Sequence, residues 1–294
     1  MILYQIIIII MANSIKLDKE IKNGLYLVPT PIGNLGDITF RAIELLKNSD
    51  FILCEDTRVS KKLLNYYKIN KKIFSYHKFN EKRKVNTIID LLKEGNIISL
   101  ISDAGTPAIS DPGRILIKNC IEENISIIPI PGPSAVTTSL SISGFSDQFY
   151  FHGFLSDTEN SIKKEFEIFK KLNCSTVFFI SAQKLNKKIS LLKEYFDDRE
   201  ILICRELTKL HETFYRRKVS EIGSINFNPK GEVTVVISEK TNFVKIDLDE
   251  SDKKTIQKLI KNESIKDIVR IFAQEKNISK SKIYNYCLKI KNEK

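Results

Sequence analysis

Residues 97–113 read IISLISDAGTPAISDPG, and the interpretation of the whole chain starts from this stretch. Its first five residues, Ile97–Ile101, are mostly apolar and predict a buried strand. A turn rich in Ser, Asp, Gly, Thr and Pro follows, and Arg114–Glu123 then reads as a helix. Ligands of open α/β sheets bind beyond the carboxyl ends of strands, which is where Asp103 and Gly105 are placed. A plain strand-to-helix turn uses the same residue types, so this stretch alone leaves both interpretations open.

The alternation of short apolar runs with helical stretches continues on both sides of residues 97–113. It predicts a mostly parallel sheet that is covered on both faces by helices. The expected strands are 25–28, 51–54, 73–75, 97–101 and 125–130, and the expected helices are 39–47, 60–67, 84–94, 114–123 and 134–141.

The composition turns polar around Gly144–Gln148, and we expect a domain boundary there. The later strands follow one another without long helices between them, so the second sheet is expected to be mixed. Its expected strands are 149–154, 176–180, 201–206 and 232–238, with helices at 159–171 and 185–196 and a polar linker at 240–251.

We therefore predict two α/β domains followed by a small helical module. Residues 1–23 are expected to be a disordered or misassigned leader. The apolar run at 1–10 is too short to span a bilayer, no Lys or Arg precedes it, and no small-residue cleavage site follows. The N-terminal domain is placed at 24–144, the second domain at 145–243 and the module at 250–294.

The chain has 294 residues and a formal net charge of +11. Residues 252–294 contain 12 Lys and Arg against 5 Asp and Glu, so +7 of this charge lies in that segment. A basic module suggests an anionic partner, most simply a nucleic acid. A lysine-rich surface that reflects an AT-rich coding bias is the alternative, and composition does not separate the two.

The basic segment has the apolar spacing of helices. Residues 265–272 place four apolar side chains at i, i+3, i+4 and i+7. Ser264 precedes this run, and Ser279 precedes a later one, as N-cap residues do. Two short helices joined at 277–279 would resemble a helix-turn-helix. A bundle that only packs on the second domain is the alternative.

Five cysteines are scattered without a CxxC pair, and most of them lie in apolar runs. We therefore expect reduced, buried thiols and a cytoplasmic protein that is not embedded in a membrane. The three histidines lie far apart in the sequence and lack the spacing of zinc ligands, so no metal is expected.

Four further loops follow predicted strands. The first, at 29–42, lacks both GxGxxG and GxxxxGK[ST], and its two prolines remove backbone donors. A dinucleotide or triphosphate site is therefore disfavoured, and a compact ligand without a phosphate chain fits better. The other loops are 55–58 (EDTR), 77–81 (HKFNE, followed by a basic run at 82–84) and 131–135 (PGPSA).

In their joint order these loops resemble the tetrapyrrole methylase superfamily. More closely, they resemble the ribosomal RNA small subunit methyltransferase I family, which methylates the 2'-oxygen of a cytidine in 16S rRNA. SDAGTP, rather than a GDP-type loop, separates this branch from the porphyrin methylases. The motifs that carry the resemblance are TPIGNLGDIT (30–39), EDTR (55–58), the His77, Asn80 and Glu81 pattern, SDAGTPAISDPG (102–113), PGPSA (131–135), FHGFL (151–155), CRELTKLHE (204–212) and GEVTVVI (231–237).

The resemblance implies a two-domain tetrapyrrole-methylase-like α/β fold, with S-adenosylmethionine bound in a cleft between the domains. It also implies 16S rRNA in the small ribosomal subunit as the partner, and a homodimer. The donor-binding positions carried over to this sequence are Ile32, Gly33, Asp103, Ala104, Thr106, Ser134, Ala135, Ser181 and Leu207.

Three carboxylates are candidate bases for the attacking hydroxyl on grounds of position: Asp56, Glu81 and Glu55. An ion pair with a nearby cation is the alternative role for each. A methylase of a small, tetrapyrrole-type substrate and a non-catalytic RNA-binding ribosome-assembly factor are the alternative functions. The expected phosphate-binding cations are Arg58, Arg83, Lys84, Lys280 and Lys282.

One segment departs from the family pattern. After the strand at 176–180 the family usually has a YESPHRL-like segment, whereas this chain reads FISAQKL at 179–185. Ile180, Gln183 and Lys184 thus stand where the family has Glu, His and Arg. The departure bears on how the substrate is positioned more than on how the donor binds.

Overall fold

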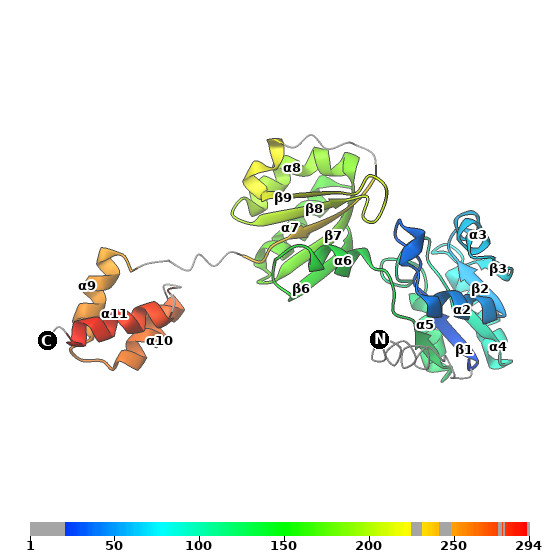
Figure 1. The fold of residues 1–294 in the computed structure, drawn as a ribbon, viewed down its shortest axis with the longest axis horizontal. Coiled ribbons are helices and arrows are strands. Elements are labelled where there is room, and N and C mark those ends of the chain that lie inside the picture. The colour runs from blue at the N-terminus through cyan, green and yellow to red at the C-terminus, as the bar shows by residue number, and fades with distance from the viewer. Residues whose placement is uncertain (1–20, 225–230, 241–247, 276–277, 279, 293–294) are drawn as a thin grey trace, which may run out of the picture. The chain divides into compact units, whose positions relative to one another are not determined.

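The computed structural model describes residues 21–224, 231–240, 248–275, 278 and 280–292. The chain divides into two compact units, one up to Glu239 and one from Lys240 (Figure 1). The predicted leader lies outside the described residues up to position 20, and so do residue 277 and the predicted cap Ser279. The domain boundaries given above stay predictions.

β4 (Ile97–Leu100) lies in the middle of a five-stranded parallel sheet with the order β3-β2-β4-β1-β5. Ile98 and Leu100 join one apolar cluster, while the buried Ser99 hydroxyl bonds the Ser49 hydroxyl at 2.7 Å. A strand covered on both faces carries the nearly continuous apolar run that residues 97–101 show. The other strands are β1 (Gly24–Leu27), β2 (Phe51–Cys54), β3 (Lys72–Ser75) and β5 (Ile127–Pro129).

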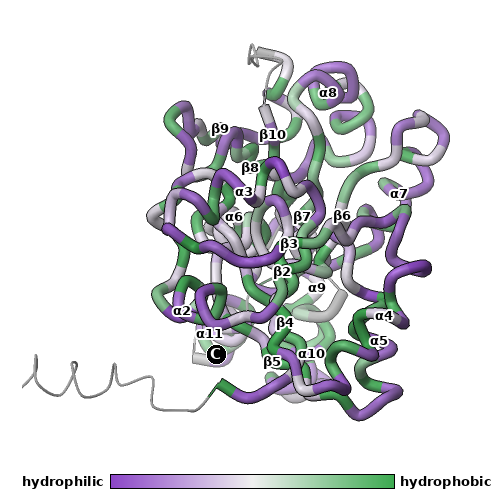
Figure 2. Tube along the Cα trace, turned by 90° about the vertical axis from the view of Figure 1, so that its right-hand side faces the viewer, coloured by the Kyte–Doolittle hydropathy of each residue, from purple (hydrophilic) through white to green (hydrophobic). Residues whose placement is uncertain are grey.

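Helices follow the strands of this sheet in the predicted order. They carry apolar and polar residues in alternation along their turns, as α4 and α5 show in Figure 2, and so present one face to the sheet. The elements are a short 3-10 turn, η1 (Leu35–Asp37), and the helices α2 (Phe40–Asn48), α3 (Thr57–Tyr66), α4 (Glu81–Lys93), α5 (Arg114–Glu122) and α6 (Ala135–Ser141).

The second sheet has the order β6-β7-β10-β8-β9 and is mixed, as expected. β6 and β7 pair in parallel, and the other neighbouring pairs are antiparallel. β9 was not predicted, because its sequence TFYRRK is polar and mostly exposed at the edge of the sheet. The elements are β6 (Phe149–Phe154), α7 (Glu159–Lys171), β7 (Ser175–Ser181), α8 (Ala182–Phe196), β8 (Glu200–Arg205), β9 (Thr213–Lys218), η2 (Val219–Ser224) and β10 (Glu232–Ile237).

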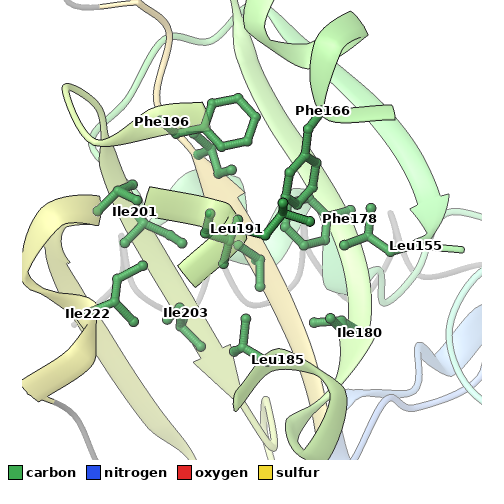
Figure 3. Packing of buried hydrophobic residues seen from close by; sticks show 14 of the residues in the cluster. Leu155, Phe166, Phe178, Ile180, Leu185, Leu191, Phe196, Ile201, Ile203 and Ile222 are labelled. Atoms are coloured by element: carbon green, nitrogen blue, oxygen red, sulfur yellow. The ribbon is translucent and has the colours of Figure 1, made fainter. Parts of the chain in front are cut away.

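The core under α7 and α8 is built from phenylalanine and branched aliphatic side chains. Figure 3 shows Phe166 and Phe178 beside Phe196 and Leu191, with Ile203 on β8. Aromatic pairs of this kind stabilise a core by about 0.5–1.5 kcal/mol beyond the area that they bury.

Helix α6 packs against the second sheet, although it follows the last strand of the first. Val136 of α6 lies in one apolar cluster with Val177, Leu202, Cys204 and Val236 of β7, β8 and β10. This packing places the loop before α6 beside the second sheet.

The unit from Lys240 onward has its own apolar core, formed by Ile256, Ile268, Phe272, Ile283 and Cys287 among others. Its helices are α9 (Glu250–Leu259), α10 (Ile265–Glu275) and α11 (Lys280–Asn292). The predicted cap before α10 is present, since Ser264 Oγ accepts from Asp267 N at 3.2 Å.

The cysteines carry free thiols, and four of them, Cys54, Cys120, Cys204 and Cys287, are buried as predicted. Among the described residues no helix combines the length and the apolar character that crossing a membrane requires.

Candidate functional site

The loop that follows β4 is held between two other loops of the first sheet. Thr30 and Gly105 exchange two main-chain hydrogen bonds, each with an N–O distance of 3.0 Å. Thr106 Oγ1 donates to Pro133 O at 3.1 Å. Gly105 has a φ of +80°, which glycine adopts without strain. Three loops that are distant in sequence therefore meet at the carboxyl edge of the sheet.

A cleft of about 290 Å³ opens at this edge and is closed on its other side by the second sheet. Its size is at the lower end of the range for small-molecule sites, about 300–1,000 Å³. The lining residues are Ile32, Asp103–Thr106, Ile109–Asp111 and Ser134–Val136 from the first sheet and its loops, with Phe154, Phe179–Ser181, Cys204, Glu206, Leu207, Lys209 and Glu232–Thr234 from the second.

The structure brings together eight of the nine predicted donor-binding positions, because all of them except Gly33 line this one cleft. Asp103 and Ser134, which come from different loops, face the same space. The role of each residue in holding a donor stays a prediction.

Gly33 lies where the first loop touches the loop after β8. A Cβ at this position would lie 2.7 Å from Leu207 O and 2.8 Å from Thr208 Oγ1. Asn34 N donates to the same Thr208 hydroxyl at 3.0 Å. Only glycine permits this close approach, which joins the two walls of the cleft.

Three neighbouring carboxyl groups, those of Glu55, Asp103 and Asp111, influence one another's pKa values, and of these Asp103 and Asp111 line the cleft whereas Glu55 does not. Burial and the neighbouring Asp103 raise the pKa of Glu55, while His77 partly offsets that rise. Burial also raises the pKa of Asp103, against the effect of the hydrogen bond that Asp103 Oδ1 accepts from Asp56 N at 3.1 Å. Burial together with Glu55 raises the pKa of Asp111 to about 6.

Asp56 and Glu81, the other two candidate bases, carry structural hydrogen bonds. Asp56 caps α3 and forms an ion pair with Arg58 at 2.6 Å, and the hydrogen bond from the Arg58 side chain lowers its pKa to about 2. Glu81 is buried, and its Oε1 accepts from Gly113 N at 2.6 Å. Neither residue lines the cleft.

The predicted phosphate-binding cations lie in different surroundings. The Arg58 side chain is exposed but paired with Asp56, and the exposed Arg83 lies on the first turn of α4. Lys84 Nζ donates to Ser75 O at 2.7 Å. Lys280 and Lys282 are exposed on α11 of the second unit.

The segment that departs from the family pattern, residues 179–185, spans the end of β7 and the start of α8. Ile180 is buried and lines the cleft, so an aliphatic side chain stands where the family usually has a carboxylate. Ser181 Oγ accepts from Lys184 N at 3.4 Å, and the Lys184 ammonium forms an ion pair with Asp157. One wall of the cleft is therefore less polar than the family pattern implies.

Asp111 was missed by the sequence analysis. Ala108 and Ser110 have φ values of +66°, a conformation that non-glycine residues seldom adopt, and Ser110 and Asp111 line the cleft. The only sequence signal was the spacing of Asp111 within SDPG, which reads equally well as an ordinary turn.

Comparison with known proteins agrees with this geometry. The family model described as Tetrapyrrole (Corrin/Porphyrin) Methylases matches residues 24–223. A crystal structure of diphthine synthase aligns with a TM-score of 0.57 at 14% identity, covering 73% of this chain and 89% of that one. Uroporphyrin-III-C-methyltransferase from Thermus thermophilus aligns with a TM-score of 0.51 at 15% identity, covering 74% and 94%. The fold and the cleft thus define a methylase of the tetrapyrrole methylase class, as predicted.

Relatives with higher sequence identity identify the family within this class. Ribosomal RNA small subunit methyltransferase I of Thermotoga maritima is 46% identical over 220 residues, which are 74% of this chain and 98% of that protein. The protein of the same name from Bacillus subtilis is 40% identical over 271 residues, covering 89% and 92%. The chain belongs to the ribosomal RNA small subunit methyltransferase I family.

As a methyltransferase of this family, the protein takes its methyl group from S-adenosylmethionine. The lining of the cleft suits such a donor. Ile32, Val136 and Leu207 provide apolar surface for a purine ring, and the Asp103 carboxylate can accept hydrogen bonds from hydroxyl or ammonium groups.

Proposed function

We propose that this methyltransferase methylates the 2'-oxygen of a cytidine ribose in 16S rRNA of the small ribosomal subunit. The observation that carries the proposal is the 46% identity with a relative named for small-subunit rRNA, over 74% of this chain. The cleft supports it, because most of its lining residues fall within the matched range 24–223.

In this proposal the donor is held mainly by main-chain atoms and by a few side chains of the two walls. Asp103 accepts from the donor's ribose hydroxyls or ammonium group, and Gly105 lets the backbone approach closely. Ser134 and Ser181 offer hydroxyl groups from opposite sides of the cleft. Gly33 acts indirectly, because it permits the contact that holds the walls together.

Methyl transfer requires a ribose oxygen in line with the methyl group and an acceptor for the hydroxyl proton. Alignment can supply roughly 7–11 kcal/mol of the barrier reduction. A general base adds roughly 10²–10⁴-fold. None of the three predicted carboxylates lines the cleft, but Glu55 is supported best, since it lies beside the lining residue Asp111 whereas Asp56 and Glu81 carry the structural bonds described above.

Asp111 joins Glu55 as a candidate proton acceptor, because it lines the cleft and its raised pKa makes it a stronger base than an ordinary aspartate. Arg58, Arg83, Lys84, Lys280 and Lys282 would contact phosphates of the RNA.

The experiment that tests this proposal is methyl transfer from S-[methyl-³H]adenosylmethionine. Unmethylated small subunits, naked 16S rRNA and uroporphyrinogen serve as acceptors, and the product nucleosides are identified by mass spectrometry. We expect 2'-O-methylcytidine from rRNA. Methylation of uroporphyrinogen alone would instead identify a small-molecule methylase, and RNA binding without any transfer would identify a non-catalytic assembly factor.

The homodimer implied by the family resemblance is part of the same proposal. Light scattering on the purified protein tests it, and the mass of a single chain at micromolar concentration would contradict it.

A further inference from the structure

Phe79 lies in the turn between β3 and α4, and its side chain is 95% exposed. Single exposed apolar residues are common on protein surfaces and need no function by themselves. Three features distinguish the surroundings of Phe79: the turn is held by hydrogen bonds, nearby cations are unpaired among the described residues, and the turn is hydrogen-bonded to a loop that lines the cleft.

The turn is held rigidly by the buried side chain of Asn80. Asn80 Oδ1 accepts from His77 N at 2.9 Å, and Asn80 Nδ2 donates to Ser75 O at 3.2 Å. The His77 ring contacts the Phe79 ring edge-on, with 6.0 Å between centroids. An aromatic ring presented by such a turn loses little conformational entropy when it binds a partner.

Three basic residues lie close to Phe79 in the sequence. Lys78, Lys82 and Arg83 are exposed, and within the described part of the chain none of them forms an ion pair with a carboxylate. Arg58 differs, because its guanidinium is already engaged by Asp56. Unpaired cations beside an exposed aromatic ring are the composition of surfaces that bind single-stranded nucleic acids.

The turn is connected directly to the cleft. Glu81, two residues after Phe79, accepts a hydrogen bond from Gly113 N at 2.6 Å. Gly113 ends the loop whose residues Ser110 and Asp111 line the cleft. On the other side of the turn, His77 lies close enough to Glu55 to influence its pKa. Phe79 thus lies in a turn that is hydrogen-bonded to the end of a loop lining the cleft.

We propose that Phe79 is a stacking platform for an unpaired nucleobase of the RNA substrate, next to the nucleotide that enters the cleft. Lys78, Lys82 and Arg83 contact the flanking phosphates. The inference rests on the proposed function, since it assumes an RNA substrate. It assigns to this turn an interaction surface for a single-stranded segment rather than for a duplex, because a base within a duplex does not expose its face.

The chain contains no tryptophan, so F79W introduces a single fluorescent reporter at this position. A nucleobase that stacks on the indole should quench its fluorescence. The probes are a single-stranded RNA oligonucleotide of mixed sequence and the same oligonucleotide annealed to its complement. We expect saturable quenching with the single strand and much less with the duplex.

F79L removes the ring while the position stays apolar. We expect F79L to weaken binding of the single strand about tenfold and to raise KM for small subunits with little change in kcat. Calorimetric binding of S-adenosylmethionine should be unchanged. F149L is the matched control, because Phe149 is also exposed but lies at the opposite end of β6 from the cleft residue Phe154.

Equal RNA affinity of F79L and F149L, or no quenching of F79W by the single strand, would overturn the inference. A conversion of dimers to monomers in F79L, seen by light scattering, would also overturn it by showing that a second copy of the chain covers Phe79. If the wild-type protein transfers no methyl group to rRNA, the proposed function fails, whereas F79W quenching still decides whether the turn stacks on a base.

Discussion

Asp111 holds its proton to a higher pH than an ordinary aspartate does, because burial and the nearby Glu55 carboxylate raise its pKa to about 6. In the unfolded chain its pKa returns to about 3.9. A carboxyl group whose pKa is raised on folding stabilises the protein below the unfolded value, and this contribution is lost as the pH rises through 6. At neutral pH the ionised Asp111 therefore destabilises the fold.

Asp111→Asn should consequently stabilise the protein at pH 8, by about 1 kcal/mol after allowance for solvent screening. The gain should shrink at pH 5, where the wild-type carboxyl is mostly protonated. Urea unfolding at both pH values measures it, and Asp90→Asn on the exposed surface of α4 is the control. An equal gain at the two pH values would contradict the assigned cause.

The same substitution should reduce methyl transfer if Asp111 accepts the hydroxyl proton. We expect a loss of about 10²–10⁴-fold in kcat with unchanged donor affinity. The wild-type rate should fall as the pH drops below about 6, and Glu55, Asp103 and His77 are the neighbouring groups that can modify this profile. A wild-type level of activity in Asp111→Asn would assign the proton to another group.

Gly33 offers a second test at the scale of single residues. In Gly33→Ala the new methyl group would collide with Leu207 O, which is main chain and cannot swing away. We expect donor affinity to fall about tenfold, because the two walls of the cleft must separate. Calorimetry measures this effect. Gly36→Ala is the control, since its Cβ would approach only Asn34 Oδ1, at 3.2 Å.

These residues show what a sequence reveals about a site. Motif resemblance placed eight of nine predicted donor positions on one cleft. It did not reveal Asp111, because its placement follows left-handed conformations at Ala108 and Ser110 that these residue types do not signal. It also could not show that Gly33 acts through the loop after β8, since that contact joins residues about 175 positions apart.

Among the secondary structure elements, buried strands were predicted well and polar ones were not. β2 and β6 have the predicted bounds because their apolar runs end at polar turns. β9 was missed because edge strands need no apolar run. Helices α3 and α4 begin three residues before the predicted starts at 60 and 84. For α3 the reason is that Asp56 caps it, accepting from Arg58 N at 2.8 Å.

Arg199 connects several elements of the second sheet. It is almost fully buried, and its guanidinium donates to Ser238 O, Lys170 O and Leu172 O at 3.2, 2.9 and 3.4 Å. Ser238 directly follows β10, and Lys170 and Leu172 lie at the end of α7. One buried side chain therefore links the end of β10 to the end of α7. The guanidinium also lies over the Phe196 ring, 5.4 Å from its centroid.

Arg199→Leu should therefore destabilise the first unit by about 2–4 kcal/mol, because three buried carbonyl groups lose their donor. Arg199→Lys should cost less, since an ammonium group restores part of the hydrogen bonding. Thermal and urea unfolding measure both variants, with Arg41→Leu on the exposed face of α2 as the control. A loss below 0.5 kcal/mol, similar to that of an ordinary surface substitution, would show that these bonds contribute little.

At the scale of the whole molecule, the chain has two compact units with separate apolar cores, and the proposed reaction assigns donor binding to the first unit and RNA affinity to the second. All of the residues that line the cleft belong to the first unit. The second unit contains the basic segment 252–294, with 12 Lys and Arg against 5 Asp and Glu. The sequence predicted this basic module from charge and apolar spacing. The sequence did not predict that α6 packs on the second sheet, because a contact between distant segments leaves no local pattern in the sequence.

A chain that ends at Glu239 should therefore fold and bind S-adenosylmethionine within about twofold of the full-length affinity. Its binding to 16S rRNA should weaken by about tenfold or more at low salt, and the dependence of affinity on salt should become shallower by about 0.7 for each lost phosphate contact. Filter binding over a salt series measures both quantities.

In the full chain, Lys280→Ala combined with Lys282→Ala should weaken RNA binding in the same direction but by less. Lys118→Ala combined with Lys163→Ala is the control and should change RNA binding little, because both lysines are already paired with glutamates. If the shortened chain loses donor binding while it still unfolds cooperatively, the second unit must act on the cleft itself, and the assignment of RNA affinity to the basic unit and donor binding to the cleft would be wrong.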